Sequence, residues 1–413
     1  MLDIKFIKDN LENVKQNCLK RNVKIDWDKF LQLDKNRLDN LTKLEAVRNE
    51  RNQKSKSKPS PEEIEKMKKL GEEEKILDQR QKNIDEEFKQ ILTAIPNMTH
   101  PETPIGGESD YKVLGVYGKK PNFSFETKDH VEILEKLDLI DFERGAKTSG
   151  AKFYFAKNDL VLLNQAIINY GIELATKAGF TLIETPDLAK RDILEGIGFN
   201  PRGEETQVYN IENSDLSLIG SAEITIGGFH SDEILDFSDG PKKYVAISHC
   251  FRTEAGSYGK TSKGLYRVHQ FTKLELFVFC KPEDSEKYHE EILNLEKEIV
   301  DGLDVNYRVI DIPSGDLGGP AYRKYDIEAF MTMHNDFGEI TSCSNCTDYQ
   351  ARRLNIKYKD ESGKNKFVHT LNGTAVNTSR WPLFIVENYQ QADGSIKIPK
   401  VLQKWMGKKV IKK

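Results

Sequence analysis

The stretch Phe251-Arg252-Thr253-Glu254 leads into a glycine-rich, basic loop over residues 255–264, and Arg267-Val268-His269-Gln270-Phe271 follows that loop. The flanking residues have the composition and alternation of β-strands. We therefore predict one strand over Tyr244–Glu254 and another over Arg267–Cys280. Strands joined by so short a loop pair as an antiparallel hairpin. The predicted fold of the rest of the chain is built outward from this hairpin.

Chemically active side chains gather on one face of each predicted strand. Because side chains alternate across a strand, Arg252 and Glu254 should share a face with Ser248 and Cys250. On the second strand one face should carry Arg267, His269, Phe271, Lys273 and Glu275. Guanidinium groups bind phosphates, an aromatic ring stacks on a base, and carboxylates bind amines, so an anionic, planar ligand would fit. An exposed sheet face with ordinary cross-strand ion pairs fits the same pattern, and the residues alone leave both interpretations open.

The segments around the hairpin favour an α+β fold. An amphipathic pattern predicts one helix over 159–178 and another over Glu283–Gly302. Further strands are predicted over Thr181–Thr185, Leu216–Ile219 and Asn306–Ile312. This order of elements indicates a mostly antiparallel sheet flanked by helices.

The N-terminal region has a different character, with long helical patterns and Gly71 as its only glycine before Gly106. The helix from Pro61 carries Leu70, Leu77, Ile84 and Ile91 every seven residues, with Met67, Phe88 and Ile95 at interleaved positions. That spacing is typical of a coiled coil. The preceding helix, roughly Trp27–Arg51, offers Leu31, Leu38, Leu41 and Leu44, and a polar turn separates the two helices. We predict an antiparallel helical arm over residues 1–100, then a proline- and glycine-containing linker, and an α+β domain over 101–413.

Composition narrows the class of protein. Charged residues make up 31% and the net charge is −4, which excludes a protein whose whole surface is basic. No apolar run approaches the roughly 18 residues of a membrane span. The five cysteines are sparse and odd in number, as expected for a reducing compartment. The N-terminus lacks the pattern of a secretory signal, so we expect a cytoplasmic protein.

The hairpin resembles motif 2 of the class II aminoacyl-tRNA synthetases, and further motifs resemble the seryl-tRNA synthetase family in particular. Those motifs are Ser221-Ala222-Glu223, residues 337–353, Glu387-Asn388-Tyr389-Gln390 and Asp393-Gly394-Ser395. The resemblance covers essentially the whole chain. It implies a class II antiparallel sheet flanked by helices, with an N-terminal antiparallel α-helical coiled-coil arm that binds tRNA. It also implies a serine–tRNA ligase that activates L-serine with ATP and charges tRNA(Ser), and tRNA(Sec) where that tRNA is present.

The resemblance implies roles for individual residues. The catalytic residues would be Arg252, Arg380 and Glu339. ATP would be bound by Arg252, Glu254, Arg267, Phe271, Glu339, Ser342 and Arg380, with Phe271 stacked on the adenine. Serine would be bound by Ser221, Glu223, Arg252, Glu275 and Thr374. Glu339 and Ser342 would be ligands of Mg²⁺, an ion that prefers oxygen donors. The arm would contact tRNA through Arg48, Arg51, Lys54, Lys56 and Lys58.

Some features allow other interpretations. Basic residues at the arm tip also fit a solvated helix end, and Cys343 and Cys346 favour packing over a zinc site because no second pair exists. Pro186 resembles the motif 1 proline, which implies a homodimer. A ligase that charges a carrier protein and a non-catalytic tRNA-binding paralogue are the rival functions. The intact arm argues against the first, and the intact motif residues argue against the second.

Two departures from the family stand out. The family usually has threonine where this chain has Ser221, so a substrate contact through that side chain would loosen. Trp381-Pro382 is unusual directly after Arg380, where we expect a helix to begin, although proline is tolerated early in a helix.

Overall fold

The computed structural model describes residues 1–54, 61–199, 207–254 and 264–413, and these form two compact units, Met1–Pro96 and Asn97–Lys413. The glycine-rich loop 255–263, together with Lys56 and Lys58, lies outside the described residues. None of the described helices is long and apolar enough to cross a membrane.

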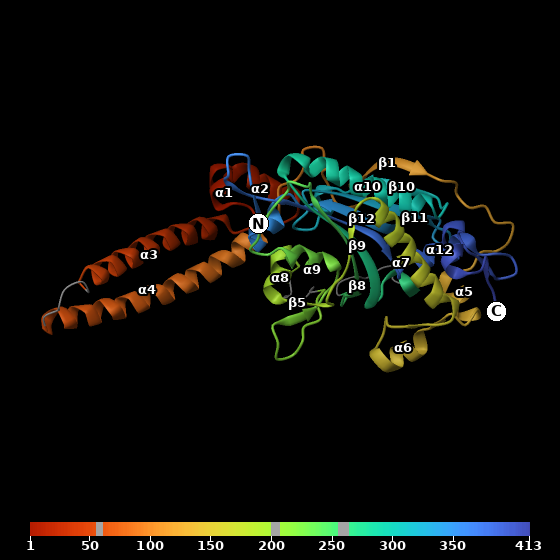
Figure 1. The fold of residues 1–413 in the computed structure, drawn as a ribbon, viewed down its shortest axis with the longest axis horizontal. Coiled ribbons are helices and arrows are strands. Elements are labelled where there is room, and N and C mark those ends of the chain that lie inside the picture. Colours follow the sequence, from red (N-terminus) through yellow and green to blue (C-terminus); the bar gives the residue numbers. More distant parts are fainter. Residues whose placement is uncertain (55–60, 200–206, 255–263) are drawn as a thin grey trace. The chain divides into compact units, whose positions relative to one another are not determined.

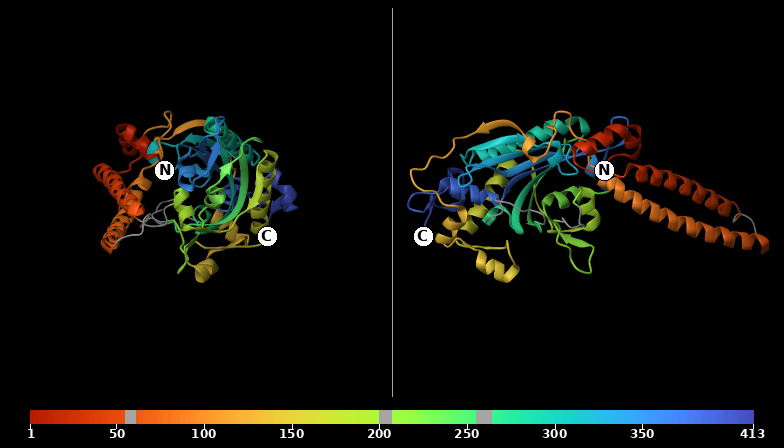
Figure 2. Two further views of the ribbon diagram at one scale, coloured as in Figure 1. Left: turned by 60° about the vertical axis from the view of Figure 1, so that its left-hand side comes forward. Right: turned by 180° about the vertical axis from the view of Figure 1, so that it is seen from behind.

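Among its described residues, 1–54 and 61–96, the N-terminal unit contains the helices α1 (Ile4–Asp9), α2 (Leu11–Lys20), α3 (Trp27–Lys54) and α4 (Pro61–Ala94). Within this unit α3 and α4 run alongside each other in every view (Figures 1 and 2). Phe30 stacks on Phe88 with ring centroids 5.1 Å apart, whereas Arg48 pairs with Glu74. Residues later in α3 therefore meet residues earlier in α4, which confirms the antiparallel coiled-coil arm.

The seam of the arm differs in part from the predicted one. Leu70, Ile84 and Phe88 are buried as expected, but Leu31 and Leu38 are exposed. On α3 the predicted Leu44 is buried, and the other buried residues are Phe30, Leu33, Asp34, Asn40 and Val47. The stripe was not predicted in full because it includes two polar residues, Asp34 and Asn40, whereas the prediction followed leucines. Asn40 Nδ2 has two acceptors across the seam, because it donates to the Leu77 carbonyl at 2.9 Å and to Gln81 at 3.0 Å.

The second unit is built on an eight-stranded sheet whose strands follow the order β1-β10-β11-β12-β15-β9-β8-β4. Neighbours are antiparallel except β4 and β8, which are parallel. The strands are β1 (Lys112–Tyr117), β4 (Thr181–Glu184), β8 (Lys242–Phe251), β9 (Gln270–Cys280), β10 (Tyr307–Asp311), β11 (Arg323–Met331), β12 (Asp336–Asn345) and β15 (His369–Asn377). The predicted antiparallel sheet is confirmed.

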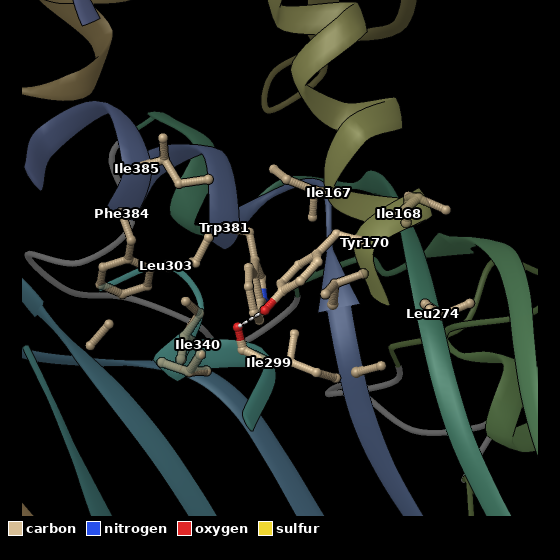
Figure 3. Packing of buried hydrophobic residues seen from close by; sticks show 14 of the residues in the cluster. Ile167, Ile168, Tyr170, Leu274, Ile299, Leu303, Ile340, Trp381, Phe384 and Ile385 are labelled. Atoms are coloured by element: carbon tan, nitrogen blue, oxygen red, sulfur yellow. Dashed lines mark hydrogen bonds between the residues drawn. The ribbon is translucent and has the colours of Figure 1, made fainter. Parts of the chain in front are cut away.

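Helices cover both faces of this sheet. One core contains Leu274 and Leu276 of β9 with residues of α7 (Asp159–Lys177), α10 (Ser285–Asp301) and α12 (Arg380–Tyr389). In that core the Tyr170 hydroxyl donates to the Ile299 carbonyl at 3.2 Å (Figure 3). The other core contains Phe277 and Phe279 with residues of α8 (Arg191–Ile197), α9 (Ala222–Phe229) and α11 (Tyr349–Leu354). Alternate residues of β9 thus face different helices, as a buried strand requires.

Smaller elements complete the unit. They are the helices α5 (His130–Lys136), α6 (Phe142–Ser149) and α13 (Gln403–Met406), the 3₁₀ turns η1 (Glu108–Asp110), η3 (Gly264–Tyr266), η4 (Pro282–Asp284), η5 (Ser314–Asp316) and η6 (Lys400–Leu402), and the strands β2 (Ile140–Asp141), β3 (Phe155–Ala156), β5 (Leu188–Lys190), β6 (Leu216–Leu218), β7 (Ile234–Leu235), β13 (Lys357–Lys359), β14 (Asn365–Phe367), β16 (Ile396–Lys397) and β17 (Val410–Ile411).

Candidate active site

The hairpin strands are shorter than predicted. β8 ends at Phe251 and β9 begins at Gln270, so Arg252, Glu254, Arg267 and His269 lie beyond the regular ladder. Glu254 has a φ of 49°, a left-handed conformation that a strand does not allow. The alternation that we extended through these residues was therefore wrong. Arg252, Glu254 and Arg267 nevertheless line one cavity together with Phe271, whereas His269 does not line it.

Hydrogen bonds hold the residues that follow the hairpin strands. Arg252 Nε donates to the Gly220 carbonyl at 3.0 Å, and its guanidinium lies over the Phe271 ring, 5.4 Å from the centroid. Arg267 Nη1 lies 3.0 Å from Glu254 Oε2. The Arg252 guanidinium is thus oriented by Gly220 and Phe271, and that of Arg267 by Glu254.

A β-bulge in β12 brings Glu339 and Ser342 to the same face. Glu339 pairs with Glu328 of β11, and Ser342 pairs with Asp326, so Ile340 is the extra residue. Directly opposed residues share a face, and Asp326 and Glu328 are two apart on their strand. Glu339 and Ser342 therefore both face this acidic side.

Arg380 is the first residue of α12 and lies against Glu339. Its Nη1 is 2.9 Å from Glu339 Oε1 and donates to the Glu339 carbonyl at 3.1 Å, while the guanidinium lies over the Tyr266 ring. Burial favours the neutral acid, but the charges of Arg380 and Lys324 outweigh it and lower the pKa of Glu339 to about 2. Glu339 is thus a carboxylate at neutral pH. Pro382 falls in the first turn of α12, where a backbone N–H has no helical partner to lose.

A second bulge, in β15, presents Thr374. Thr374 pairs with Glu275 and Asn377 with Lys273, and Ala375 is the extra residue between them. Glu275 is buried and forms an ion pair with Lys273. Ser221 Oγ accepts from Glu223 N at 3.1 Å and so caps α9. The hydroxyl of Ser221, which stands where the family usually has threonine, therefore has a structural partner in this chain.

Glu223 and Glu275 are two carboxyls close to each other, of which Glu275 is buried and Glu223 partly buried. Burial, and then the charge of Glu275, raises the pKa of Glu223 to about 7. Gln350 and Asn372 donate to Glu223 Oε1 at 2.9 and 3.0 Å. Burial likewise raises the pKa of Glu275, although Lys273 opposes it. Such a pair is suited to an ammonium group, which would supply the missing positive charge.

Two neighbouring cavities contain most of these side chains. The first, of about 310 Å³, is lined by predicted residues from β9, β12, β15, α12 and the segments that adjoin β8 and β9: Arg252, Glu254, Arg267, Phe271, Glu339, Ser342, Thr374 and Arg380. The second, of about 370 Å³, contains Glu223 and Asn372. Lys324 borders both. The anionic-ligand interpretation of the hairpin therefore gains over that of an ordinary sheet face.

Sequence reasoning missed Lys324, Tyr266, Asn372 and Asn377, all of which line these cavities. A signal existed for Lys324, because Lys324, Asp326 and Glu328 alternate with apolar residues as on a half-buried strand. Nothing comparable marks Asn377, because the bulge before it breaks the alternation.

The arm tip carries fewer free cations than its composition suggests. Arg48 Nε and Nη2 lie 3.1 Å from Glu74 and Asp78, and Arg51 Nη1 lies 2.6 Å from Glu74. All three pairs are at least partly exposed. Lys54 ends α3, and its side chain, like Lys56 and Lys58, lies outside the described residues.

Comparison with known proteins identifies the family. Residues 1–99 match the seryl-tRNA synthetase N-terminal domain, and residues 207–389 match the class II tRNA synthetase core domain (G, H, P, S and T). The chain belongs to the seryl-tRNA synthetase family. It is 52% identical to the serine–tRNA ligase of Treponema denticola over 98% of this chain and 99% of that protein. With the enzyme of Dictyoglomus thermophilum the identity is 49%, over 100% and 99%.

Solved structures agree with this assignment. The seryl-tRNA synthetase of Pyrococcus horikoshii, complexed with ATP, superposes with a TM-score of 0.89 at 38% identity, covering 100% of this chain and 99% of that one. The cytoplasmic serine–tRNA ligase of Naegleria fowleri, in complex with AMP, gives a TM-score of 0.82 at 32% identity, with 98% and 96% covered. The predicted class II fold is confirmed. The activity of the chain is that of its family, the ligation of serine to tRNA.

Proposed function

We propose that the 310 Å³ cavity binds ATP and that serine binds beside it, between Thr374 and the Glu223–Glu275 pair. The observation that carries the proposal is the convergence of Arg252, Glu339 and Arg380 on this one cavity. Arg252 would bind the α-phosphate and the serine carboxylate, and Arg380 and Arg267 the outer phosphates. Phe271 would stack on adenine, and Glu254 would accept from its amino group.

The proposed reaction requires that the reactants be positioned and that their negative charge be neutralised. The serine carboxylate attacks the α-phosphorus, the bond to pyrophosphate breaks, and seryl-adenylate forms. A hydroxyl at the tRNA 3′ end then attacks the activated carbonyl, and AMP leaves. No protein nucleophile is required, so the arginines act by holding the reactants and stabilising the developing charge.

Mg²⁺ fits the residues that are present. Glu339 is kept ionised and faces the same side as the Ser342 hydroxyl, and both are the hard oxygen donors that this ion prefers. Glu339 and Ser342 would hold the ion, which would neutralise part of the phosphate charge when bound. Across the described ranges, His, Cys, Asp and Glu form no group of three or more that could hold a metal alone.

Serine would be recognised by charge and by its hydroxyl. Glu223 and Glu275 would bind the ammonium group, Thr374 the hydroxyl, and Ser221 would support Glu275. Alanine lacks the hydroxyl and would leave its buried hydrogen-bonding partner in the site unpaired. Such a site discriminates strongly against alanine. Serine-dependent ATP–pyrophosphate exchange tests this, with alanine, cysteine and threonine as competitors. Equal exchange with alanine would contradict the proposed serine site.

For the helical arm, over residues 1–100, we propose contact with tRNA(Ser), and with tRNA(Sec) where the organism has it. Its support is the match of residues 1–99 to the family's N-terminal domain and the basic tip around Arg48 and Arg51. We propose that residues 101–413 form the catalytic domain. The five described cysteines are free, which suits the reducing cytoplasm that we propose as the location.

We also propose a homodimer that uses the β4 edge of the sheet. β4 ends the strand order, and Leu182 on it is 46% exposed. Val161 and Leu162 of α7, which packs against β4, are exposed as well. Exposed apolar side chains at an unpaired strand edge favour association. Sedimentation of the wild type and of Leu182→Asp tests this, since a dimer should dissociate in the variant.

A further inference from the structure

Asn377 is a buried amide at the junction of β15 and α12. It is the last residue of β15, and only 6% of it is exposed. Its Oδ1 accepts from Arg380 N at 2.8 Å, from Ser379 Oγ at 3.1 Å and from Ser379 N at 3.3 Å. On its other side, Nδ2 donates to the Ile340 carbonyl at 3.2 Å.

The Asn377 side chain connects two structural features of the site, the bulge of β12 and the start of α12. Ile340 is the bulge residue that turns Glu339 and Ser342 to one face, and Arg380 is the first residue of α12. The carbonyl of Glu339, next to Ile340, accepts from the Arg380 side chain at 3.1 Å. The Glu339 carbonyl of β12 thus accepts from the Arg380 side chain. The adjacent Ile340 carbonyl accepts from Asn377, whose Oδ1 in turn accepts from the Arg380 backbone N–H.

We propose that Asn377 is a positioning residue for the ATP-dependent step, one that ties the start of α12 to the bulge of β12. The proposal rests on the proposed function, in which Arg380 binds the outer phosphates and Glu339 binds Mg²⁺. If the tie breaks, Arg380 and Glu339 move relative to each other. Misplacement by about 1 Å can cost on the order of 10²-fold in rate.

A simple helix-capping role is the alternative, and it uses different atoms. A cap needs only an oxygen that accepts from the first backbone N–H groups. The tie also needs the Nδ2 donor to Ile340. Asn377→Asp separates the two, because it retains the acceptor and loses the donor, while Asn377→Ala loses both.

The chain offers a matched control in Asn388 at the other end of α12. Its Nδ2 donates to the Phe330 carbonyl of β11 at 3.0 Å and to the Phe384 carbonyl at 2.9 Å, so it also links the helix to the sheet. It lines neither of the two cavities. Asn388→Ala should therefore lower the melting temperature without changing the ATP-dependent kinetics.

The experiment is serine-dependent ATP–pyrophosphate exchange by the full-length enzyme, with melting temperatures for all variants. We expect Asn377→Ala and Asn377→Asp each to raise the KM for ATP and for pyrophosphate by about tenfold or more and to lower kcat. The KM for serine should stay within about twofold of wild type, because its binding groups lie elsewhere. Full activity of Asn377→Asp would overturn the tie, since a cap would then suffice.

Equal kinetic losses in Asn377→Ala and Asn388→Ala would also overturn it, because general loosening of α12 would explain both. If Asn377→Ala does not fold, Asn377→Asp alone decides between tie and cap. Absence of serine-dependent exchange in the wild type would instead refute the proposed function, and this outcome is distinct from a failure of the tie.

Discussion

Glu339 and Ser342 are three residues apart on β12 and yet face the same side of the sheet, because the bulge at Ile340 removes one step of the alternation. A regular strand would send the two side chains to opposite faces. The bulge thus creates the oxygen pair that we propose for Mg²⁺. Bulges are over-represented beside active sites, where they re-aim a side chain in this way.

Removing the hydroxyl of Ser342 should weaken the metal site while the carboxylate remains. For Ser342→Ala we expect the Mg²⁺ concentration that gives half-maximal exchange to rise by about tenfold or more. A titration of exchange rate with Mg²⁺ at saturating ATP checks this. Ser395→Ala is the control, because the Ser395 hydroxyl donates to Asp393 and lines neither of the two cavities. An unchanged titration in Ser342→Ala would exclude Ser342 as a ligand.

Arg252→Ala should abolish adenylate formation without unfolding the protein. In the part of the chain that the structure describes, the side chain donates one hydrogen bond to the backbone, to Gly220, so little of that part depends on it. Loss of a charged contact that strengthens in the transition state should lower exchange by about 10²–10³-fold. Arg252→Lys should recover only part of the activity, because an ammonium cannot form the bidentate contact. Exchange within tenfold of wild type in Arg252→Ala would contradict the assignment.

The raised pKa of Glu223, about 7, predicts that serine binding depends on pH. The carboxyl must be ionised to bind the serine ammonium, and about a tenth is ionised one unit below the pKa. The KM for serine should therefore fall by about tenfold between pH 6 and pH 8, while the KM for ATP changes little. Glu223→Gln should have a high KM for serine at every pH. A wild-type KM for serine that is constant over this range would show that Glu223 does not titrate as proposed.

Much of the fold follows from periodicity alone. The predicted helix over 159–178 is α7, and that over Glu283–Gly302 is α10, because each has a continuous apolar stripe that packs on the sheet. The site residues could be identified from sequence motifs. Their geometry could not be predicted, because two bulges and the left-handed conformation of Glu254 break the alternation on which strand predictions depend.

The arm shows a different limit of sequence reasoning. The α3 stripe passes through the buried Asn40, whose Nδ2 donates to Leu77 and Gln81 of α4. A polar residue at a seam position is invisible to a hydrophobic pattern, although such residues fix the register of coiled coils. The assignment of Leu31 and Leu38 to the seam was wrong because it followed leucines alone, and both of these residues are exposed.

Deletion of the arm should separate the two steps of the reaction. Replacing residues 30–93 by a short linker should leave serine-dependent exchange within about threefold of wild type, because the cavity residues all belong to Asn97–Lys413. Charging of tRNA(Ser) should collapse, since the proposed phosphate contacts are removed. Loss of exchange in a truncated enzyme that still melts cooperatively would show that the arm is part of the catalytic machinery.

The ion pairs at the arm tip predict an unusual gain of function. Glu74 accepts from both Arg48 and Arg51, and these arginines lower its pKa, so it is ionised and neutralises the tip at physiological pH. Exposed ion pairs are weak, and phosphates can replace the carboxylate as partners of the arginines. Glu74→Gln should therefore strengthen tRNA(Ser) binding by about threefold to tenfold at low salt and make the salt dependence steeper, because more counterions are released on binding.

Glu86→Gln is the matched control for Glu74→Gln. It makes the same change of net charge at an exposed position near the other end of α4. Filter-binding measurements across a salt series should separate a local effect at the tip from a general effect of charge. Equal gains in the two variants would indicate non-specific attraction. A loss of affinity in Glu74→Gln would show instead that the carboxylate holds the arginines in the orientation that tRNA requires.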